Sequence, residues 1–442
     1  MRQLRKRKKT TLSCLLVMML LIALAACAPP DDNHNSPVTG DDDDPFAPDD
    51  ITDNVDDDDD DDEPTDRVGT SRREGYALDQ YLLDIMERTH LPGLAAALLR
   101  DGHVVWATHL GTADLDNGWP VTDETLFLVG SLSKTIIATA VMQLWDAGLV
   151  DLDVDVNQYL PFAVRHPRFP QMTITLRHLL THTAGIRDQE DTMREWIGPG
   201  DSDLPLGGFL RAYLTEDGEL YKENHFWDYP PGGRWKYSNI GASLAAYVVE
   251  EITGTPYAAY CKRFVFGPLG MTDSSYRLRD LDSAMVAMPY EYEFFPAGYL
   301  ALGHYGMPYY PAGTVRTTAP ELARVMIMMH GGGEIDGERV LSREAVAEIM
   351  RRPYPERWPH QGLLWYYGAY DGREVFGHQG GGMGVASKMF YRPEDGVGVV
   401  LLANGAWGGL WERLIIEGAM FHLFRAAERI GRQLYDPETM NY

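Results

Sequence analysis

Two groups of strand-like runs, one early and one late in the chain, are separated by well over a hundred residues with helical periodicity. Residues 94–99 and 104–107 are apolar runs around the turn Asp101-Gly102, a pattern typical of a β-hairpin. The late runs cover residues 375–377, 387–391 and 397–403. The pattern predicts an α/β (α+β) fold whose antiparallel sheet is built from N- and C-terminal segments.

Helical patterns supply the rest of the predicted architecture. They cover residues 78–89, 174–181, 243–253, 321–329 and 410–430. The fourth follows Thr318-x-x-Glu321, which is typical of a capping box. Because a helix must bury its apolar face, we expect helices to flank the sheet and the middle helices to form an all-helical lobe. A cleft between lobe and sheet is the expected place for a functional site.

The first 27 residues predict export from the cytoplasm. Six basic residues up to Lys9 precede an apolar run at residues 15–26, which is typical of a secretory signal peptide and too short to span a membrane. The segment ends in Leu24-Ala25-Ala26-Cys27, which resembles the bacterial lipoprotein cleavage box. The resemblance implies cleavage before Cys27 and a lipid on its sulfur and, with Ala28 following, the outer membrane of a Gram-negative cell. An ordinary signal peptide with an incidental cysteine is the alternative.

Residues 28–70 predict a tether and no packed structure. Eighteen acidic residues and no Lys or Arg lie between Asp31 and Asp66, so the segment repels itself and cannot bury a core. A calcium site is the alternative, but no Asp-x-Asp-x-Asp-Gly loop with a closing glutamate is present. We interpret the segment as a solvated linker.

The body, residues 71–442, is acidic and has one cysteine. Of the net charge of −26, about −14 remains for residues 67–442, which argues against nucleic acid as a partner. Membrane contact is expected only through the lipid on Cys27, and no pattern indicates an oligomeric state. Cys261 is the only cysteine after Cys27, so the body must be stabilised by its core and not by an internal disulfide.

Ser131 and Lys134 form the first candidate for chemistry. Apolar residues recur at helical spacing from Thr135, so Ser131 is expected at the first turn of a buried helix, with Lys134 on the same face. The free N–H groups and the dipole at a helix start favour anionic character near the serine oxygen. Such a serine is usually only an N-cap, so a catalytic role requires partners from elsewhere in the chain.

Two further polar clusters are placed to supply these partners. Tyr237-Ser238-Asn239 lies between the turn at residues 230–233 and a helix, and His378-Gln379-Gly380-Gly381-Gly382 follows a short strand. Together with Ser131-Leu132-Ser133-Lys134 they resemble the three motifs of the serine β-lactamase and penicillin-binding superfamily. The closer resemblance is to class C β-lactamases, D-alanyl-D-alanine carboxypeptidases and related esterases, and it extends from about residue 75 to about residue 425.

The resemblance implies a β-lactamase/transpeptidase-like fold and a role for each motif. Ser131 would attack a carbonyl and form an acyl-enzyme, while Lys134 and Tyr237 share the proton transfers. Asn239 would orient Lys134 and the substrate, and His378 would form the opposite wall. Gly380 and the N–H of Gly381 would contact the substrate, with the Ser131 and Gly381 amides as the oxyanion hole. This chemistry requires no metal and no organic cofactor.

His378 is the main departure from the class A and class C pattern, in which a lysine stands at this position. A lysine is a permanent cation for the carboxylate of a β-lactam, whereas histidine is mostly neutral at pH 7. We therefore expect a small-molecule or peptidoglycan-type substrate with an ester or a D-amino-acid amide bond. A class C-like β-lactamase and a non-catalytic binding lipoprotein of the cell envelope are the alternatives.

Other patterns fit less well. His178 and His182 have zinc-ligand spacing but lack the glutamate and a third ligand, so structural histidines are favoured. Gly241-Ala242-Ser243-Leu244-Ala245 approximates a nucleophile elbow, but its last glycine is missing and no apolar strand precedes it. Eight aromatic residues between Tyr290 and Tyr310 predict either an acyl pocket or loop packing.

Overall fold

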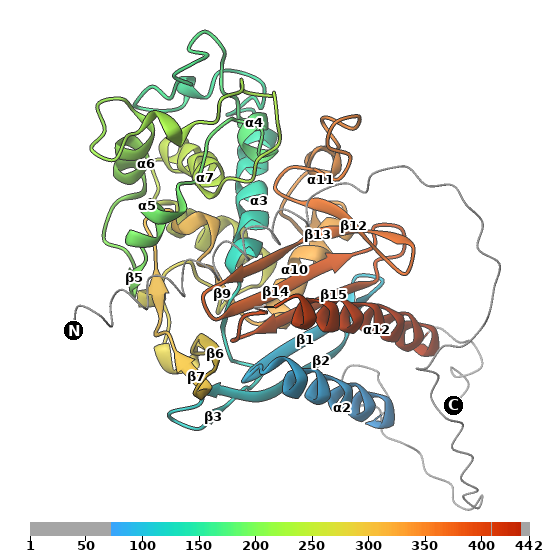
Figure 1. The fold of residues 1–442 in the computed structure, drawn as a ribbon. Helices are drawn as coiled ribbons and strands as arrows, with labels where there is room; N and C mark the ends of the chain where they lie inside the picture. Colours follow the sequence, from blue (N-terminus) through green and yellow to red (C-terminus); the bar gives the residue numbers. More distant parts are fainter. Residues whose placement is uncertain (1–71, 408, 435–442) are drawn as a thin grey trace, which may run out of the picture. The chain divides into compact units, whose positions relative to one another are not determined.

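The computed structural model describes residues 72–407 and 409–434 (Figure 1). The expected signal peptide (residues 1–27), its lipidation site Cys27 and the acidic linker (residues 28–70) lie outside these residues. No helix in the described part of the chain combines the length and apolarity that crossing a bilayer requires.

A seven-stranded sheet has the strand order β12-β13-β14-β15-β1-β2-β3, and each neighbouring pair is antiparallel. Its strands are β1 (Gly93–Arg100), β2 (His103–Asp114), β3 (Trp119–Pro120), β12 (Tyr366–Tyr370), β13 (Arg373–Gly382), β14 (Val385–Tyr391) and β15 (Gly398–Ala403). β1 pairs with β15 from Leu94 opposite Ala403 to Leu99 opposite Gly398. The prediction of one antiparallel sheet from the two ends of the chain is confirmed.

Helices cover both faces of this sheet (Figure 1). On one face α2 (Arg72–Thr89) and α12 (Leu410–Leu434) pack with Leu94, Ala96 and Leu98 of β1. On the other face α3 (Ser133–Asp146) and α10 (Ala319–His330) share a core with Ala95, Ala97 and Leu99. Because both faces are covered, β1 is buried from Gly93 to Leu99 and its sequence is continuously apolar.

The middle of the chain forms the expected helical lobe, above the sheet in Figure 1. Its helices are α4 (Leu176–Leu180), α5 (Glu190–Glu195), α6 (Leu206–Leu214), α7 (Asn239–Thr253), α8 (Tyr257–Cys261) and α9 (Gly267–Leu269). Short strand pairs join β4 (Phe127–Leu128) to β9 (Arg316–Thr317), β5 (Gly198–Pro199) to β8 (Tyr305–Gly306), and β10 (Glu334–Ile335) to β11 (Glu338–Arg339). α3 packs against α7 and also faces the sheet, so its apolar side chains are buried on nearly every side.

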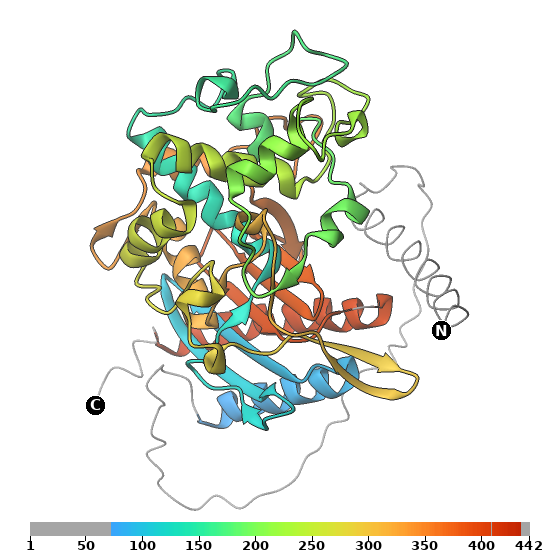
Figure 2. The same ribbon diagram turned by 90° about the vertical axis from the view of Figure 1, so that its left-hand side faces the viewer.

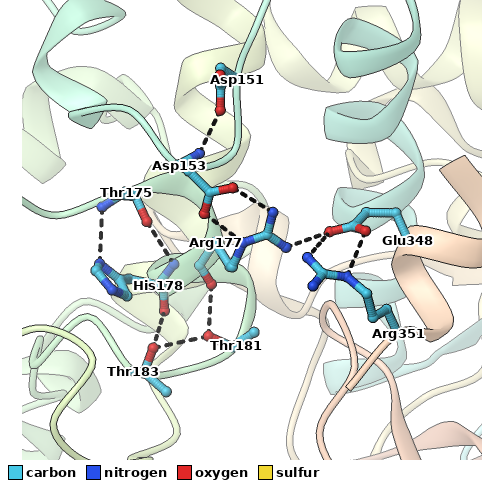
Figure 3. A network of polar contacts seen from close by, with 9 residues as sticks. All are labelled: Asp151, Asp153, Thr175, Arg177, His178, Thr181, Thr183, Glu348 and Arg351. Atoms are coloured by element: carbon cyan, nitrogen blue, oxygen red, sulfur yellow. Dashed lines mark hydrogen bonds and ion pairs between the residues drawn. The ribbon is translucent and has the colours of Figure 1, made fainter. Parts of the chain in front are cut away.

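A polar network joins the lobe to α11 (Arg343–Met350), as Figure 3 shows. The Arg177 guanidinium of α4 donates to both carboxylate oxygens of Asp153 at 2.6 and 2.7 Å and also to Glu348 of α11. Glu348 in turn accepts two bonds from Arg351 at 2.7 and 2.8 Å. Such bidentate charged bonds fix orientation, so α4 and the loop before it are held against α11.

The predicted helix at residues 174–181 is shorter in the structure, and the predicted capping box at Thr318 is only half formed. α4 ends at Leu180, and His182 follows with φ of +57°, so His178 and His182 do not share a helical face. Thr318 Oγ1 accepts from Glu321 N at 3.2 Å as a capping box requires. The Glu321 carboxylate, however, accepts from Asp273 N and Ser274 Oγ at 2.9 and 2.6 Å and not from the cap.

A hairpin of β6 (Tyr290–Phe294) and β7 (Ala297–Ala301) was not predicted. It projects from the side of the molecule (yellow in Figure 2), and Phe295 at its tip is 96% exposed. Tyr292 and Tyr299 pack edge to face within it, with ring centroids 5.2 Å apart. These rings pack on one another, so loop packing and not an acyl pocket describes this part of the aromatic cluster.

Candidate active site

Ser131 lies in a tight 3-10 turn, Gly130–Leu132, that leads directly into α3. Gly130 has φ of +54°, a conformation that favours glycine. Ser133 Oγ donates to Gly130 O at 2.7 Å and accepts from Val315 N at 3.1 Å. The turn is therefore fastened from two sides, and Ser131 stands at the start of a buried helix as predicted.

Lys134 is fully buried, and its amine has three polar partners. Nζ donates to Ser131 Oγ at 3.1 Å, to Asn239 Oδ1 at 2.7 Å and to Ala312 O at 2.7 Å. Removal from water lowers the pKa of Lys134 to about 7, and the more distant Asp188 carboxylate opposes this shift. Near neutral pH the amine can therefore exist without its proton, beside the Ser131 hydroxyl.

Tyr237 brings its ring against the same amine. Lys134 Nζ lies 4.9 Å from the centroid of the Tyr237 ring. The His182 ring packs on Tyr237 at a centroid distance of 4.4 Å, and the His378 ring lies 6.4 Å away. The lobe and the sheet thus both contribute aromatic rings around Lys134.

Asn239 is the first residue of α7, and its side chain is held from behind by Asp188. Asp188 Oδ2 accepts from Asn239 N at 2.6 Å and from Asn239 Nδ2 at 2.9 Å. Asp188 was not predicted as a site residue. It stands three residues after Gly185 in a loop without periodicity, and the contact spans 51 residues, so no local pattern indicates it.

The glycines at the end of β13 let this strand approach the Ser131 turn. A Cβ placed on Gly380 would lie 2.1 Å from Val129 O and 3.0 Å from Ser131 N, so no side chain fits there. Gly381 N lies 3.2 Å from a Cβ placed on Gly130, which puts this amide at the same turn. Ser387 Oγ of the neighbouring strand β14 donates to Val129 O at 2.8 Å and fixes the spacing.

His378 is 4% exposed and stands on β13 beside Tyr366 of β12, with ring centroids 5.2 Å apart. Burial lowers the pKa of His378 to about 3, and the nearby Lys134 amine adds to the shift. Nδ1 lies 2.7 Å from the Gln379 carbonyl oxygen, so the proton of the neutral ring is on Nδ1 and Nε2 is an acceptor. At this position the site therefore offers a neutral imidazole and no cation.

The competing patterns have structural roles. His178 completes a capping box with Thr175, and His182 Nδ1 accepts from Ser238 N at 3.2 Å. Ser243 is buried within α7 and donates to Tyr309 O at 3.1 Å, so it has none of the exposure of a nucleophile elbow. Among the described residues, no three His, Cys, Asp or Glu side chains are grouped as a metal site requires.

The structure brings all seven predicted site residues of the body together around the Ser131–Lys134 pair. They are Ser131, Lys134, Tyr237, Asn239, His378, Gly380 and Gly381. A serine hydroxyl beside a buried amine, with peptide N–H groups of a turn and a strand next to it, is an arrangement suited to nucleophilic attack on a carbonyl.

Comparison with known proteins agrees with this geometry. The family model described as Beta-lactamase matches residues 78–409. "Penicillin-binding protein 4" of Amycolatopsis lactamdurans is 30% identical over 342 residues, which cover 72% of this chain and 81% of that protein. "Esterase EstB" of Burkholderia gladioli is 30% identical over 204 residues, 45% of this chain and only 50% of the esterase. The solved D-amino acid amidase from Ochrobactrum anthropi SV3 has a TM-score of 0.65 at 22% identity, covering 81% of this chain and 99% of that one. The chain belongs to the beta-lactamase family of serine hydrolases.

Proposed function

We propose that this serine hydrolase forms an acyl-enzyme on Ser131 and cleaves an ester or a D-amino-acid amide in the cell envelope. The observation that carries the proposal is the buried Lys134 amine, with a pKa of about 7, at 3.1 Å from Ser131 Oγ. A general base works best when its pKa is near the operating pH, and it must be within hydrogen-bond reach of the proton it removes. Lys134 meets both requirements.

In the first half of the proposed reaction, Lys134 Nζ takes the Ser131 proton as Oγ forms a bond to the substrate carbonyl carbon. The N–H groups of Ser131 and Gly381 are the proposed donors to the resulting oxyanion, and such a donor contributes about 10²–10³ in rate. Tyr237, whose ring lies beside Lys134, passes the proton to the leaving alcohol or amine as the scissile bond breaks. Water then attacks the acyl-enzyme with the same groups in reverse order, and Ser131 recovers its proton.

His378 and Asn239 are proposed to define the substrate. His378 Nε2 is an acceptor, and the Asn239 amide oxygen accepts from Lys134 Nζ at 2.7 Å. A neutral His378 favours esters and D-amino-acid amides over β-lactams, because a β-lactam brings a carboxylate that a cation binds best. Relatives named as an esterase and as a penicillin-binding protein support this class, which includes fragments of peptidoglycan.

The test is a comparison of three substrates: p-nitrophenyl acetate, D-alanine amide and nitrocefin, of which only nitrocefin carries a carboxylate. We expect kcat/KM for the ester or the amide to exceed that for nitrocefin, and the reverse order would overturn the role given to His378. Ser131→Ala should abolish turnover and covalent labelling by a fluorophosphonate probe. A wild-type protein that neither labels nor hydrolyses an ester would favour the non-catalytic binding protein.

The placement in the envelope rests on the N-terminal sequence. We propose a signal peptide at residues 1–27, a lipid on Cys27, a solvated linker at residues 28–70 and a hydrolase domain at residues 71–442. Expression of the full chain in a Gram-negative host should yield a detergent-phase protein whose N-terminal fragment carries acyl chains by mass spectrometry. Cys27→Ala should move the protein to the aqueous phase, while an unchanged partition would contradict the anchor.

A further inference from the structure

Asp188, in the loop between α4 and α5, accepts four hydrogen bonds from the consecutive residues 238–240. Oδ1 accepts from Ser238 Oγ at 2.8 Å and from Ile240 N at 3.2 Å. Oδ2 accepts from Asn239 N at 2.6 Å and from Asn239 Nδ2 at 2.9 Å. The carboxylate therefore lies at the N-terminus of α7. Burial raises the pKa of Asp188 above its ordinary value, and the hydrogen bonds from Asn239, Ser238 and Ile240 oppose this shift by favouring the anion.

These bonds determine which end of the Asn239 amide meets Lys134. With Nδ2 held by Asp188, Oδ1 is directed to the Lys134 amine at 2.7 Å. Rotation of the amide by half a turn would place Nδ2 against Lys134, donor against donor, and would leave Asp188 with one fewer donor. The carboxylate thus acts on Lys134 through Asn239 without touching it.

Asp188 also supplies a negative charge close to Lys134. No Asp or Glu of the described residues forms an ion pair with Lys134. The titratable side chains that face the amine from other elements are Tyr237, His182 and His378, and burial lowers the pKa of both histidines. Tyr213 and Tyr309 lie near enough to Asp188 to feel its charge, and burial raises the pKa of both phenols. Asp188 is therefore the carboxylate whose negative charge opposes the lowering of the Lys134 pKa.

We propose that Asp188 is a positioning residue for the Ser131–Lys134 pair, which fixes the Asn239 amide and places one negative charge behind the Lys134 amine. This inference rests on the proposed function, in which Lys134 is the base. In this proposal the Asp188 carboxylate has two effects that can be measured separately. Orientation of Asn239 affects the maximum rate, and the charge affects the pH at which Lys134 loses its proton.

The experiment measures the rate at which a fluorophosphonate probe phosphonylates Ser131, with loss of fluoride, between pH 5 and pH 9. The acid limb of this profile reports the essential base of the free enzyme. In Asp188→Asn the protonated amine loses its counter-charge, so the limb should move to lower pH by about one unit. The maximum rate should fall by about tenfold or more, because Asn239 is no longer held in place.

Two variants separate charge from structure. Asp188→Glu keeps the charge, so its acid limb should stay close to that of the wild type even though its rate falls. Asp201→Asn is the matched control, because Asp201 also accepts from two backbone amides, Leu278 N and Arg279 N, both at 2.9 Å. Asp201→Asn should leave both the limb and the rate near wild type.

A lower rate with an unmoved acid limb in Asp188→Asn would show a structural role only and would overturn the proposal. If Asp188→Asn lacks a cooperative unfolding transition, Asp188→Ser replaces it, with the same expected shift. Labelling that persists in Ser131→Ala would instead overturn the proposed function, so the two failures are distinguishable.

Discussion

Lys134 and Lys388 are both buried, yet their surroundings give them different uses. Lys134, in α3, meets a hydroxyl, an amide oxygen and a backbone carbonyl, and no carboxylate bonds to it directly. Lys388, in β14, is 3% exposed and forms an ion pair with Glu417 of α12, with Tyr370 Oη and Gln379 Oε1 each at 3.4 Å. The two lysines lie on opposite sides of the seven-stranded sheet.

The comparison shows that one side of the sheet carries the candidate catalytic residues, while the other side carries an ion pair that stabilises the fold. Alternation along β14 directs Ser387 to the Ser131 turn and Lys388 to α12. A buried ammonium with its own carboxylate holds two elements together. A buried amine that meets only neutral oxygens loses much of its affinity for a proton and becomes a base.

The largest difference between the two lysines is expected in activity, when each is replaced by methionine. Lys134→Met should lower kcat/KM for p-nitrophenyl acetate by about 10²–10⁴, the usual contribution of a positioned acid–base group. Lys388→Met should keep the rate within about threefold, because only packing behind the sheet changes. Comparable losses in the two variants would show that Lys134 acts through structure.

The pH dependence of stability should also distinguish the two lysines. The pKa of Lys134 is about 7 when folded against 10.5 for an ordinary lysine, so between these values the unfolded chain binds a proton that the folded chain does not. The free energy of unfolding should therefore rise with pH from about 7 to 10, by at most about 1.4 kcal/mol per unit. In urea titrations, this increment should vanish in Lys134→Met and persist in Lys388→Met. Equal slopes in the wild type and Lys134→Met would refute it.

The smallest expected effect is on the ion pair itself. Lys388→Met should lower the free energy of unfolding by about 1–2 kcal/mol, because two elements lose a charged hydrogen bond while Glu417, 43% exposed, still reaches water. Lys388→Arg should restore most of this, since it keeps the charge. Thermal unfolding at pH 7 measures the stability of both variants. If Lys388→Met is as stable as the wild type, the Lys388–Glu417 ion pair makes no net contribution to stability.

Much of the fold and of the site could be predicted because the informative residues are local. Ser131 and Lys134 are three residues apart at the start of α3, and Tyr237 and Asn239 stand at the start of α7. Asp188 could not be found, since an aspartate in a loop carries no sign of a partner 51 residues away. β12, with the sequence Tyr-Tyr-Gly-Ala-Tyr, lacks a regular alternation. The β6–β7 hairpin could have been predicted, because aromatic and charged residues alternate from Tyr290 to Phe294 with the period of a strand. Helix ends were uncertain where side chains found other partners, as Glu321 did with Ser274.

The position of β1 in the sheet has a consequence for biosynthesis. Leu94 of β1 lies opposite Ala403 of β15. The ribosome therefore makes the central strand β1 about three hundred residues before its partner β15. Until the ribosome has released that last strand, β1 has a vacant edge, and closure of so long a loop slows folding. The sheet can therefore be completed only after β15 has left the ribosome, and until then the nascent chain has time to meet chaperones or a translocation channel while still unfolded.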